Sequence, residues 1–204
     1  METSQSRFNV SRYATIILAA GSSSRLGSPK QLLIHREKTL LQNSIDTAKL
    51  INSDQIIVIL GSNRALIKNE INAEEIVLIE NQNWESGLAS SIKAGIEALK
   101  IISPDIDAII LMVCDQPYAD AEVLKSLLTK QVETGRALVG CMYENTKGIP
   151  ALFHSSLFPE LLSLDGDSGA KKLFEKYNKV ASFISFKDGG IDIDTLEDYK
   201  NLAK

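Results

Sequence analysis

Short apolar stretches alternate with longer amphipathic stretches along the chain from residue 14 onward. Runs rich in β-branched residues predict strands near 14–19, 55–60, 76–80, 107–113, 137–142 and 180–185. Helical spacing of the apolar positions predicts helices near 38–51, 63–72, 87–100, 120–134, 155–162 and 168–177. Residues 56–60 and 108–113 are apolar throughout, which is typical of strands covered on both faces. The pattern predicts an α/β fold: a single Rossmann-like, three-layer domain with a mostly parallel central sheet.

The composition supports this picture and excludes several function classes. The 204 residues are 44% hydrophobic and 24% charged, so the chain can bury a substantial core. We expect one domain over 14–204, after a flexible leader over 1–13. A net charge of −4 argues against nonspecific binding to nucleic acid, and no apolar run approaches the roughly 18 residues that span a membrane. Two cysteines without C-x-x-C spacing, Cys114 and Cys141, favour a cytoplasmic location.

The first predicted strand leads into a loop with the composition of a phosphate-binding site. Small residues over 19–24 let the backbone approach a ligand, and successive N–H groups of such a loop can surround phosphate oxygens. Arg25 and Lys30 add two positive charges within reach. The spacing fits neither a P-loop nor the G-x-G-x-x-G fingerprint, and an ordinary Ser/Gly turn is the alternative. The predicted nucleotide contacts here are Leu18, Ala19, Ala20, Gly21, Ser22, Ser23, Arg25 and Lys30.

A second candidate group, Cys114-Asp115-Gln116-Pro117, follows the strand predicted over 107–113. Ligands of parallel sheets bind at the carboxyl ends of the strands, so Asp115 would lie near the phosphate loop if the two strands are neighbours. Mg²⁺ prefers phosphate oxygens together with one or two protein carboxylates. We therefore expect Asp115 to hold Mg²⁺ against a triphosphate. The alternative role is a helix cap, but Asp120 is better placed for that.

The segment 81–96 has a polar start, then Gly87 and small residues that lead into a predicted helix. Such a helix start exposes N–H groups that can bind an anion. Ser90 and Ser91 could bind a base or ribose edge, or could use their hydroxyls within the first helical turn. The residues alone leave both readings open.

The last third of the chain holds the remaining candidates. Asp167 is suited to cap the helix predicted next, and the same helix start with Gly169 could equally receive an acceptor phosphate. Asp192 and Asp194 alternate on a predicted strand and share one face. Asp194 and Glu197 have the spacing of a capping box, which makes Asp192 the candidate for a second Mg²⁺ carboxylate, although the pair could share the metal.

These stretches resemble the MobA-like nucleotidyltransferases. Residues 18–30 match every fixed position of the signature L-A-A-G-x-x-x-R-[LM]-G-x-x-K, and Asp115-Gln116-Pro117 resembles the form found in the MocA branch, the molybdenum cofactor cytidylyltransferases. Weaker matches are the segments 81–92, 148–153, 164–172 and 191–198.

The resemblance implies a fold of the nucleotide-diphospho-sugar transferase type and transfer of a nucleotide, most simply CMP from CTP, with Mg²⁺ and release of pyrophosphate. The acceptor would be molybdopterin or its molybdenum cofactor, and molybdoenzymes that receive the product would be partners. The implied catalytic residues are Arg25, Lys30 and Asp115, the implied pocket residues are Gly87, Ser90 and Ser91, and the implied acceptor contacts are Gln116, Asp167 and Gly169. The alternatives are another NTP or a sugar-phosphate or alditol-phosphate acceptor, and a non-catalytic nucleotide-binding regulator of molybdoenzyme maturation.

Overall fold

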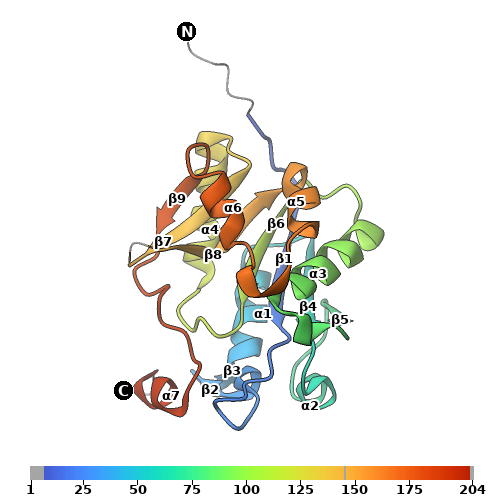
Figure 1. The fold of residues 1–204 in the computed structure, drawn as a ribbon, viewed down its shortest axis with the longest axis vertical. Helices are drawn as coiled ribbons and strands as arrows, with labels where there is room; N and C mark the ends of the chain where they lie inside the picture. The colour runs from blue at the N-terminus through green and yellow to red at the C-terminus, as the bar shows by residue number, and fades with distance from the viewer. Residues whose placement is uncertain (1–6, 145, 203–204) are drawn as a thin grey trace.

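Seven strands form one central sheet in the computed structural model, which describes residues 7–144 and 146–202 (Figure 1). The strands are β1 (Tyr13–Ala19), β4 (Gln55–Leu60), β5 (Val77–Glu80), β6 (Ala108–Val113), β7 (Leu138–Tyr143), β8 (Thr146–His154) and β9 (Ser182–Ser185). Their order is β5-β4-β1-β6-β8-β7-β9. Neighbours are parallel except where β8 pairs with β6 and β7. The predicted α/β fold with a mostly parallel sheet is confirmed.

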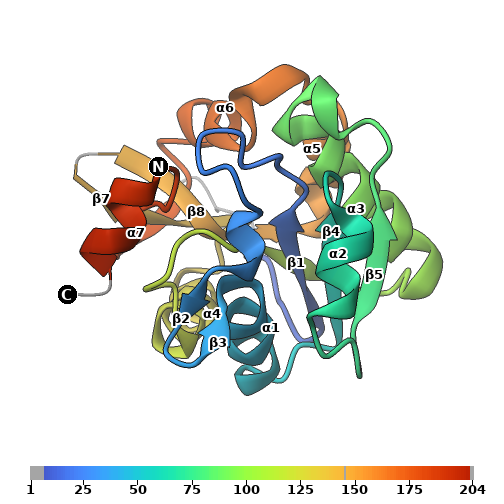
Figure 2. The same ribbon diagram turned by 90° about the horizontal axis from the view of Figure 1, so that it is seen from below.

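Helices cover both faces of the sheet and give three layers (Figure 2). One face carries α1 (Leu40–Leu50), α2 (Arg64–Asn69) and α4 (Ala121–Thr134); the other carries α3 (Leu88–Ile102), α5 (Phe158–Leu162) and α6 (Lys171–Lys176). Because side chains alternate along a strand, Ile16 and Leu18 of β1 pack under α3, while Ile17 and Ala19 pack under α1. All four are buried, which explains why residues 16–19 of β1 are all apolar.

Asp115 and Asp120 both precede α4, and the structure shows which of them caps this helix. Asp120 Oδ1 accepts hydrogen bonds from the N–H groups of Glu122 and Val123, each at 3.0 Å. A cap of this kind satisfies N–H groups that have no partner within the helix. Asp120 is therefore the cap, as predicted, and Asp115 is available for another role.

Three helices begin two or three residues later than predicted. The helix predicted over 38–51 begins at Leu40, because β2 (Ile34–His35) and β3 (Lys38–Thr39) form a short hairpin before it. The helix predicted over 155–162 starts as a 3-10 turn, Ser155–Leu157, before α5. A second 3-10 turn, Gly166–Ser168, precedes α6, whose N-cap is Ala170. Asp167 therefore does not cap this helix, contrary to one of its two predicted roles.

The periodicity misses strand β8. Pro150 interrupts its apolar run, and proline is disfavoured inside a central strand because it has no N–H to donate. The structure accommodates Pro150 at a register irregularity, where Cys141 pairs with Gly148 and Val139 pairs with Leu152. The ladder is already interrupted at this point, so it loses little by the missing donor.

The predicted leader is packed from Arg7 onward, and residues 1–6 lie outside the described part of the chain. Phe8 N–H donates to Gly135 O at 2.9 Å, and the N–H groups of Ser11 and Arg12 donate to Asp107 Oδ2 at 2.8 and 2.9 Å. Residues 7–12 thus include backbone donors that bind the folded domain, and the flexibility of the leader stays a prediction. Within the described residues, no helix is long and apolar enough to cross a membrane.

Candidate active site

The loops that follow β1, β5 and β6 surround a cavity of about 360 Å³ at the carboxyl edge of the sheet, which faces the viewer in Figure 2. β1 pairs directly with β6, with Leu18 opposite Val113, so the loop over 20–30 and Asp115 are neighbours. Ten predicted site residues line the cavity: Leu18, Ala19, Ala20, Gly21, Ser22, Lys30, Gly87, Ser91, Asp115 and Asp167. Gln31, Trp84, Glu85 and Leu88 also line it.

Gln31 holds the loop after β1 in place, a role that the sequence did not suggest. Its side chain is buried, and Nε2 donates to Ala19 O at 2.8 Å and to Gly21 O at 3.0 Å. Ala20 O accepts from Ser62 N–H at 3.1 Å. The carbonyl groups of residues 19–21 thus all accept hydrogen bonds from other segments of the chain. The N–H groups of residues 21–25, in contrast, donate to no described residue. A loop with anchored carbonyls and free N–H groups has the polarity that a phosphate requires.

Ser23 and Arg25 lie outside the cavity lining, on the loop that borders it. Ser23 adopts a positive φ of 55°, and its Oγ accepts from Lys30 N–H at 2.9 Å, which closes the loop. Arg25 has a largely exposed side chain whose guanidinium donates to Asp194 Oδ2 at 2.8 Å. Ser23 therefore supports the loop, and Arg25 is a cation that can turn toward a ligand at the edge of the cavity.

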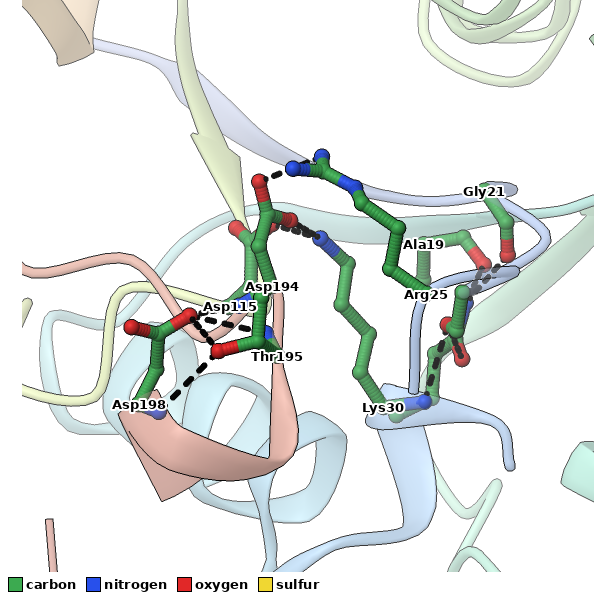
Figure 3. A network of polar contacts seen from close by, with 10 residues as sticks. Ala19, Gly21, Arg25, Lys30, Asp115, Asp194, Thr195 and Asp198 are labelled. Atoms are coloured by element: carbon green, nitrogen blue, oxygen red, sulfur yellow. Dashed lines mark hydrogen bonds and ion pairs between the residues drawn. The ribbon is translucent and has the colours of Figure 1, made fainter. Parts of the chain in front are cut away.

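Lys30 lies at the centre of a charge cluster with two carboxylates (Figure 3). Its Nζ donates to Asp115 Oδ2 and, at 2.9 Å, to Asp194 Oδ1. Burial alone would lower the pKa of Lys30, but the two carboxylates raise it above its ordinary value. The hydrogen bond from Lys30 is in turn the main reason why the pKa of Asp194 lies below its usual range. Lys30 therefore remains a cation at neutral pH.

The C-terminal segment returns to the N-terminal loop and supplies Asp194. Ile193 N–H donates to Asp115 O at 3.0 Å, and the buried Ile193 side chain packs with Leu26 and Leu40. Helix α7 (Leu196–Leu202) follows, and Tyr199 Oη donates to Ile34 O at 2.9 Å. The segment thus contacts the loop over 20–30 through Leu26, Arg25 and Lys30.

The capping box of α7 differs from the predicted one. Thr195 N–H donates to Asp198 Oδ2 at 2.8 Å, and Asp198 N–H donates to Thr195 Oγ1 at 3.2 Å. This reciprocal pair is a capping box shifted by one residue from the predicted pair of Asp194 and Glu197. Because Thr195 and Asp198 satisfy the helix start, the carboxylate of Asp194 can bind the two cations.

Asp192 lies close to the same cluster. Burial of its carboxyl group, with repulsion from Asp115 and Asp194, raises the pKa of Asp192 to about 6. Within the described residues, no three His, Cys, Asp or Glu side chains form a metal-binding group.

The two predicted serines of α3 have different surroundings. Ser90 lies outside the cavity lining, and its hydroxyl donates to Gly87 O at 2.8 Å. This bond is the alternative predicted from the sequence, in which the hydroxyl acts within the first helical turn. Ser91 is buried and lines the cavity. Both hydroxyls accept hydrogen bonds from Nδ2 of Asn81, a buried residue that the sequence did not single out.

The predicted acceptor residues do not converge. Asp167 lines the cavity at the carboxyl edge of the sheet, beside Gly87, whereas the buried Gly169 packs against Leu88. Gln116 lines a second cavity of about 330 Å³ between α1 and the start of α4. Its Nε2 donates to Gly189 O at 2.8 Å, and its Oε1 is one of two buried side-chain polar atoms in the described residues that have no hydrogen-bond partner.

Comparison with known proteins agrees with this geometry. Residues 15–180 match the MobA-like NTP transferase domain. Nicotine blue oxidoreductase of Paenarthrobacter nicotinovorans is 28% identical over 198 residues, which cover 92% of this chain and 94% of that protein. The purine catabolism protein PucB of Bacillus subtilis (strain 168) is 27% identical over 200 residues, covering 93% and 95%.

A solved structure shows the same fold over nearly the whole chain. Rv0371c from Mycobacterium tuberculosis H37Rv is 29% identical with a TM-score of 0.81, covering 95% of this chain and 98% of that one. The same protein in complex with manganese is 28% identical with a TM-score of 0.75, covering 94% and 98%.

The anchored loop after β1, the cations Arg25 and Lys30, and the carboxylates of Asp115 and Asp194 form one charged cluster beside the cavity. The chain belongs to the MobA-like NTP transferase family, whose members are nucleotidyltransferases, and this confirms the resemblance seen in the sequence.

Proposed function

We propose that this nucleotidyltransferase transfers CMP from CTP to a phosphate group of molybdopterin or the molybdenum cofactor. The observation that carries the reaction type is the Lys30 cluster, in which one ammonium group meets two carboxylates beside a loop of free N–H groups. The base and the acceptor rest on the resemblance of 18–21 and 115–117 to the MocA branch.

In the proposed reaction, an acceptor phosphate oxygen attacks the α-phosphorus of CTP in line with the leaving group. A new P–O bond forms, the bond from the α-phosphorus to the bridging oxygen breaks, and pyrophosphate leaves with that electron pair. An acceptor phosphate is already anionic at neutral pH, so no general base is needed. The rate then depends on positioning and on neutralising charge.

Different groups of the site would bind the phosphates and neutralise their charge. The N–H groups of 21–25 and the Arg25 guanidinium would bind the β- and γ-phosphates. Lys30 would neutralise the charge that grows on the α-phosphate. Both side chains have carboxylate partners, which orient them before the nucleotide arrives.

The donor set also fits a divalent cation. Asp115 would hold it, and Asp192 is the second carboxylate predicted from the sequence. Asp194 is also suited to this place, because Asp115 and Asp194 both contact Lys30 Nζ and their carboxylates therefore lie close together. When bound, Mg²⁺ supplies charge neutralisation and a fixed orientation of the phosphates. The structure of Rv0371c with manganese supports a divalent ion in a related protein.

The deciding assay is pyrophosphate release with Mg²⁺ and each of CTP, GTP, ATP and UTP, with and without molybdopterin. We expect release that needs both CTP and molybdopterin. Release that needs GTP and molybdopterin would overturn the base, and release with a sugar phosphate or alditol phosphate would overturn the acceptor.

A non-catalytic regulator is the alternative of another class, and Asp115→Asn separates it from an enzyme. In an enzyme this variant should lose turnover by about 10²-fold or more. In a binding module it should lose only part of the nucleotide affinity.

A further inference from the structure

The Asn81 side chain joins the end of β5 to the first turn of α3, and its amide orientation is fixed. Asn81 is 6% exposed, and its Oδ1 accepts from Asn83 N–H at 2.9 Å. A backbone N–H can only donate, so the atom that it contacts must be the amide oxygen. The amide nitrogen therefore faces the two serines, at 2.8 Å from Ser90 Oγ and 3.0 Å from Ser91 Oγ.

The hydrogen count of this group assigns a direction to each hydroxyl. The NH₂ group of Asn81 has two hydrogens, and one goes to each serine. Each serine hydroxyl has accepted a hydrogen bond and keeps one hydrogen to donate. Ser90 donates its hydrogen to Gly87 O at 2.8 Å. Ser91 donates to no residue in the described part of the chain, although it is 3% exposed and lines the cavity.

We propose that Asn81 is a specificity-determining positioning residue: it fixes Ser91 as a hydrogen-bond donor toward the cavity, and thereby selects a nucleobase edge that accepts there. The inference rests on the proposed function and adds a physical reason for its base preference. Asn81 occupies one of the two lone pairs of Ser91 Oγ. If Ser91 accepted from the ligand through the other lone pair, its own hydrogen would have no acceptor among the described residues, and an unpaired buried donor is costly.

Cytosine and uracil are the informative pair because they have the same size and differ in polarity. Atom N3 of cytosine accepts a hydrogen bond, whereas N3–H of uracil donates one. A donor that meets a donor leaves two buried polar groups unpaired, which strongly disfavours the wrong ligand. Glu85 and Asp167 line the same cavity, and their carboxylates accept hydrogen bonds, which suits the exocyclic amino group of cytosine. Ser91 should therefore select CTP over UTP.

The test measures the affinity ratio of CTP to UTP with non-hydrolysable analogues and Mg²⁺, without acceptor. Trp84, the single tryptophan of the chain, lines the cavity and provides a fluorescence signal. Asn81→Asp replaces the NH₂ group by an oxygen that accepts from Ser91 and so withdraws the donor from the cavity. Ser91→Ala removes the hydroxyl, and Ser90→Ala is the matched control on the neighbouring position. Both nucleotides carry the same triphosphate, so a general loss of affinity cancels in the ratio.

We expect the wild-type protein to bind CTP at least tenfold more tightly than UTP. Asn81→Asp and Ser91→Ala should each reduce this ratio about tenfold, and Ser90→Ala should leave it unchanged. Equal affinities in the wild type, or a wild-type ratio in both Asn81→Asp and Ser91→Ala, would overturn the inference while pyrophosphate release still supported the proposed function. A wild-type protein that binds none of the four nucleotides and releases no pyrophosphate would overturn the proposed function itself.

Discussion

Replacement of Lys30 by methionine tests the centre of the proposed mechanism. The substitution keeps most of the side-chain volume and removes one positive charge from a side chain that is 16% exposed. A unit charge about 4 Å from charge that develops on the α-phosphate is worth about 4 kcal/mol at an effective dielectric constant near 20. Since each 1.36 kcal/mol is a factor of ten in rate, kcat should fall by about 10³-fold.

The same substitution should cost less in stability than in rate. Removing one partner of a fully buried ion pair costs about 3–5 kcal/mol. Here the Asp194 side chain is 39% exposed and keeps Arg25 as a partner, so solvent screens part of the loss. We expect a loss of about 1–2 kcal/mol in the free energy of unfolding, which leaves a folded protein in which kinetics can be measured.

The assay is pyrophosphate release over a range of CTP concentrations, which gives kcat and KM separately, with thermal unfolding measured in parallel. Lys30→Arg keeps the charge and should retain more activity than Lys30→Met. Lys38→Met is a matched control, because Lys38 lies on the exposed β2–β3 hairpin, pairs with Asp46 of α1, and does not line the cavity. If Lys30→Met turned over within threefold of the wild type and bound CTP equally well, the role assigned to Lys30 would be refuted.

Four further predictions concern other positions of the chain. Gly87 has a φ of 98°, and a Cβ there would lie 2.5 Å from the backbone of Gly166; Gly87→Ala should therefore cost about 1–3 kcal/mol in thermal unfolding and weaken nucleotide binding. Burial raises the pKa of Cys114 and of Cys141 to about 12, so both thiols should resist a disulfide reagent at pH 8 until guanidinium unfolds the chain. Because the pKa of each thiol is higher in the folded than in the unfolded chain, only the unfolded thiols ionise between about pH 8.5 and 12. The free energy of unfolding should therefore fall as the pH rises through this range. Thr195→Ala breaks a capping box and should cost about 1 kcal/mol and increase hydrogen exchange in α7.

The parts of the structure that the sequence predicts are those in which local pattern and tertiary structure agree. The strands β1 and β6 are buried on both faces, so continuous apolar runs identify them within one residue of their bounds. Asp120 caps α4 because the cap is a local interaction between neighbours in the chain. Most of the nucleotide contacts predicted from the loop after β1 line one cavity, because they sit on consecutive residues.

Other features depend on contacts between distant segments and were therefore missed. Gln31 follows Lys30 directly, but its role depends on where its side chain turns, toward the carbonyls of Ala19 and Gly21. Asp194 lies 169 residues after Arg25, so no spacing rule could join them. The local pattern suggested a capping role instead, which Thr195 and Asp198 fill. The apolar pattern does not predict strand β8, because proline has a low strand propensity. In the folded chain, tertiary pairing with the neighbouring strands outweighs this preference of Pro150.

The return of the C-terminal segment to the N-terminal loop has a consequence for biosynthesis. A ribosome makes Arg25 and Lys30 early, and the strands that carry the cavity can begin to pair while translation continues. Asp194 is translated after the last strand of the sheet, so both cations lack this carboxylate partner until almost the whole chain has been made. In a nascent or prematurely terminated chain that ends before Asp194, Lys30 keeps Asp115 as its partner, whereas Arg25 loses its carboxylate and is left as an unpaired cation for any cellular polyphosphate. The full charge cluster therefore forms only after Asp194 has been translated. Salt should weaken polyanion binding more in chains truncated before Asp194 than in chains that contain it.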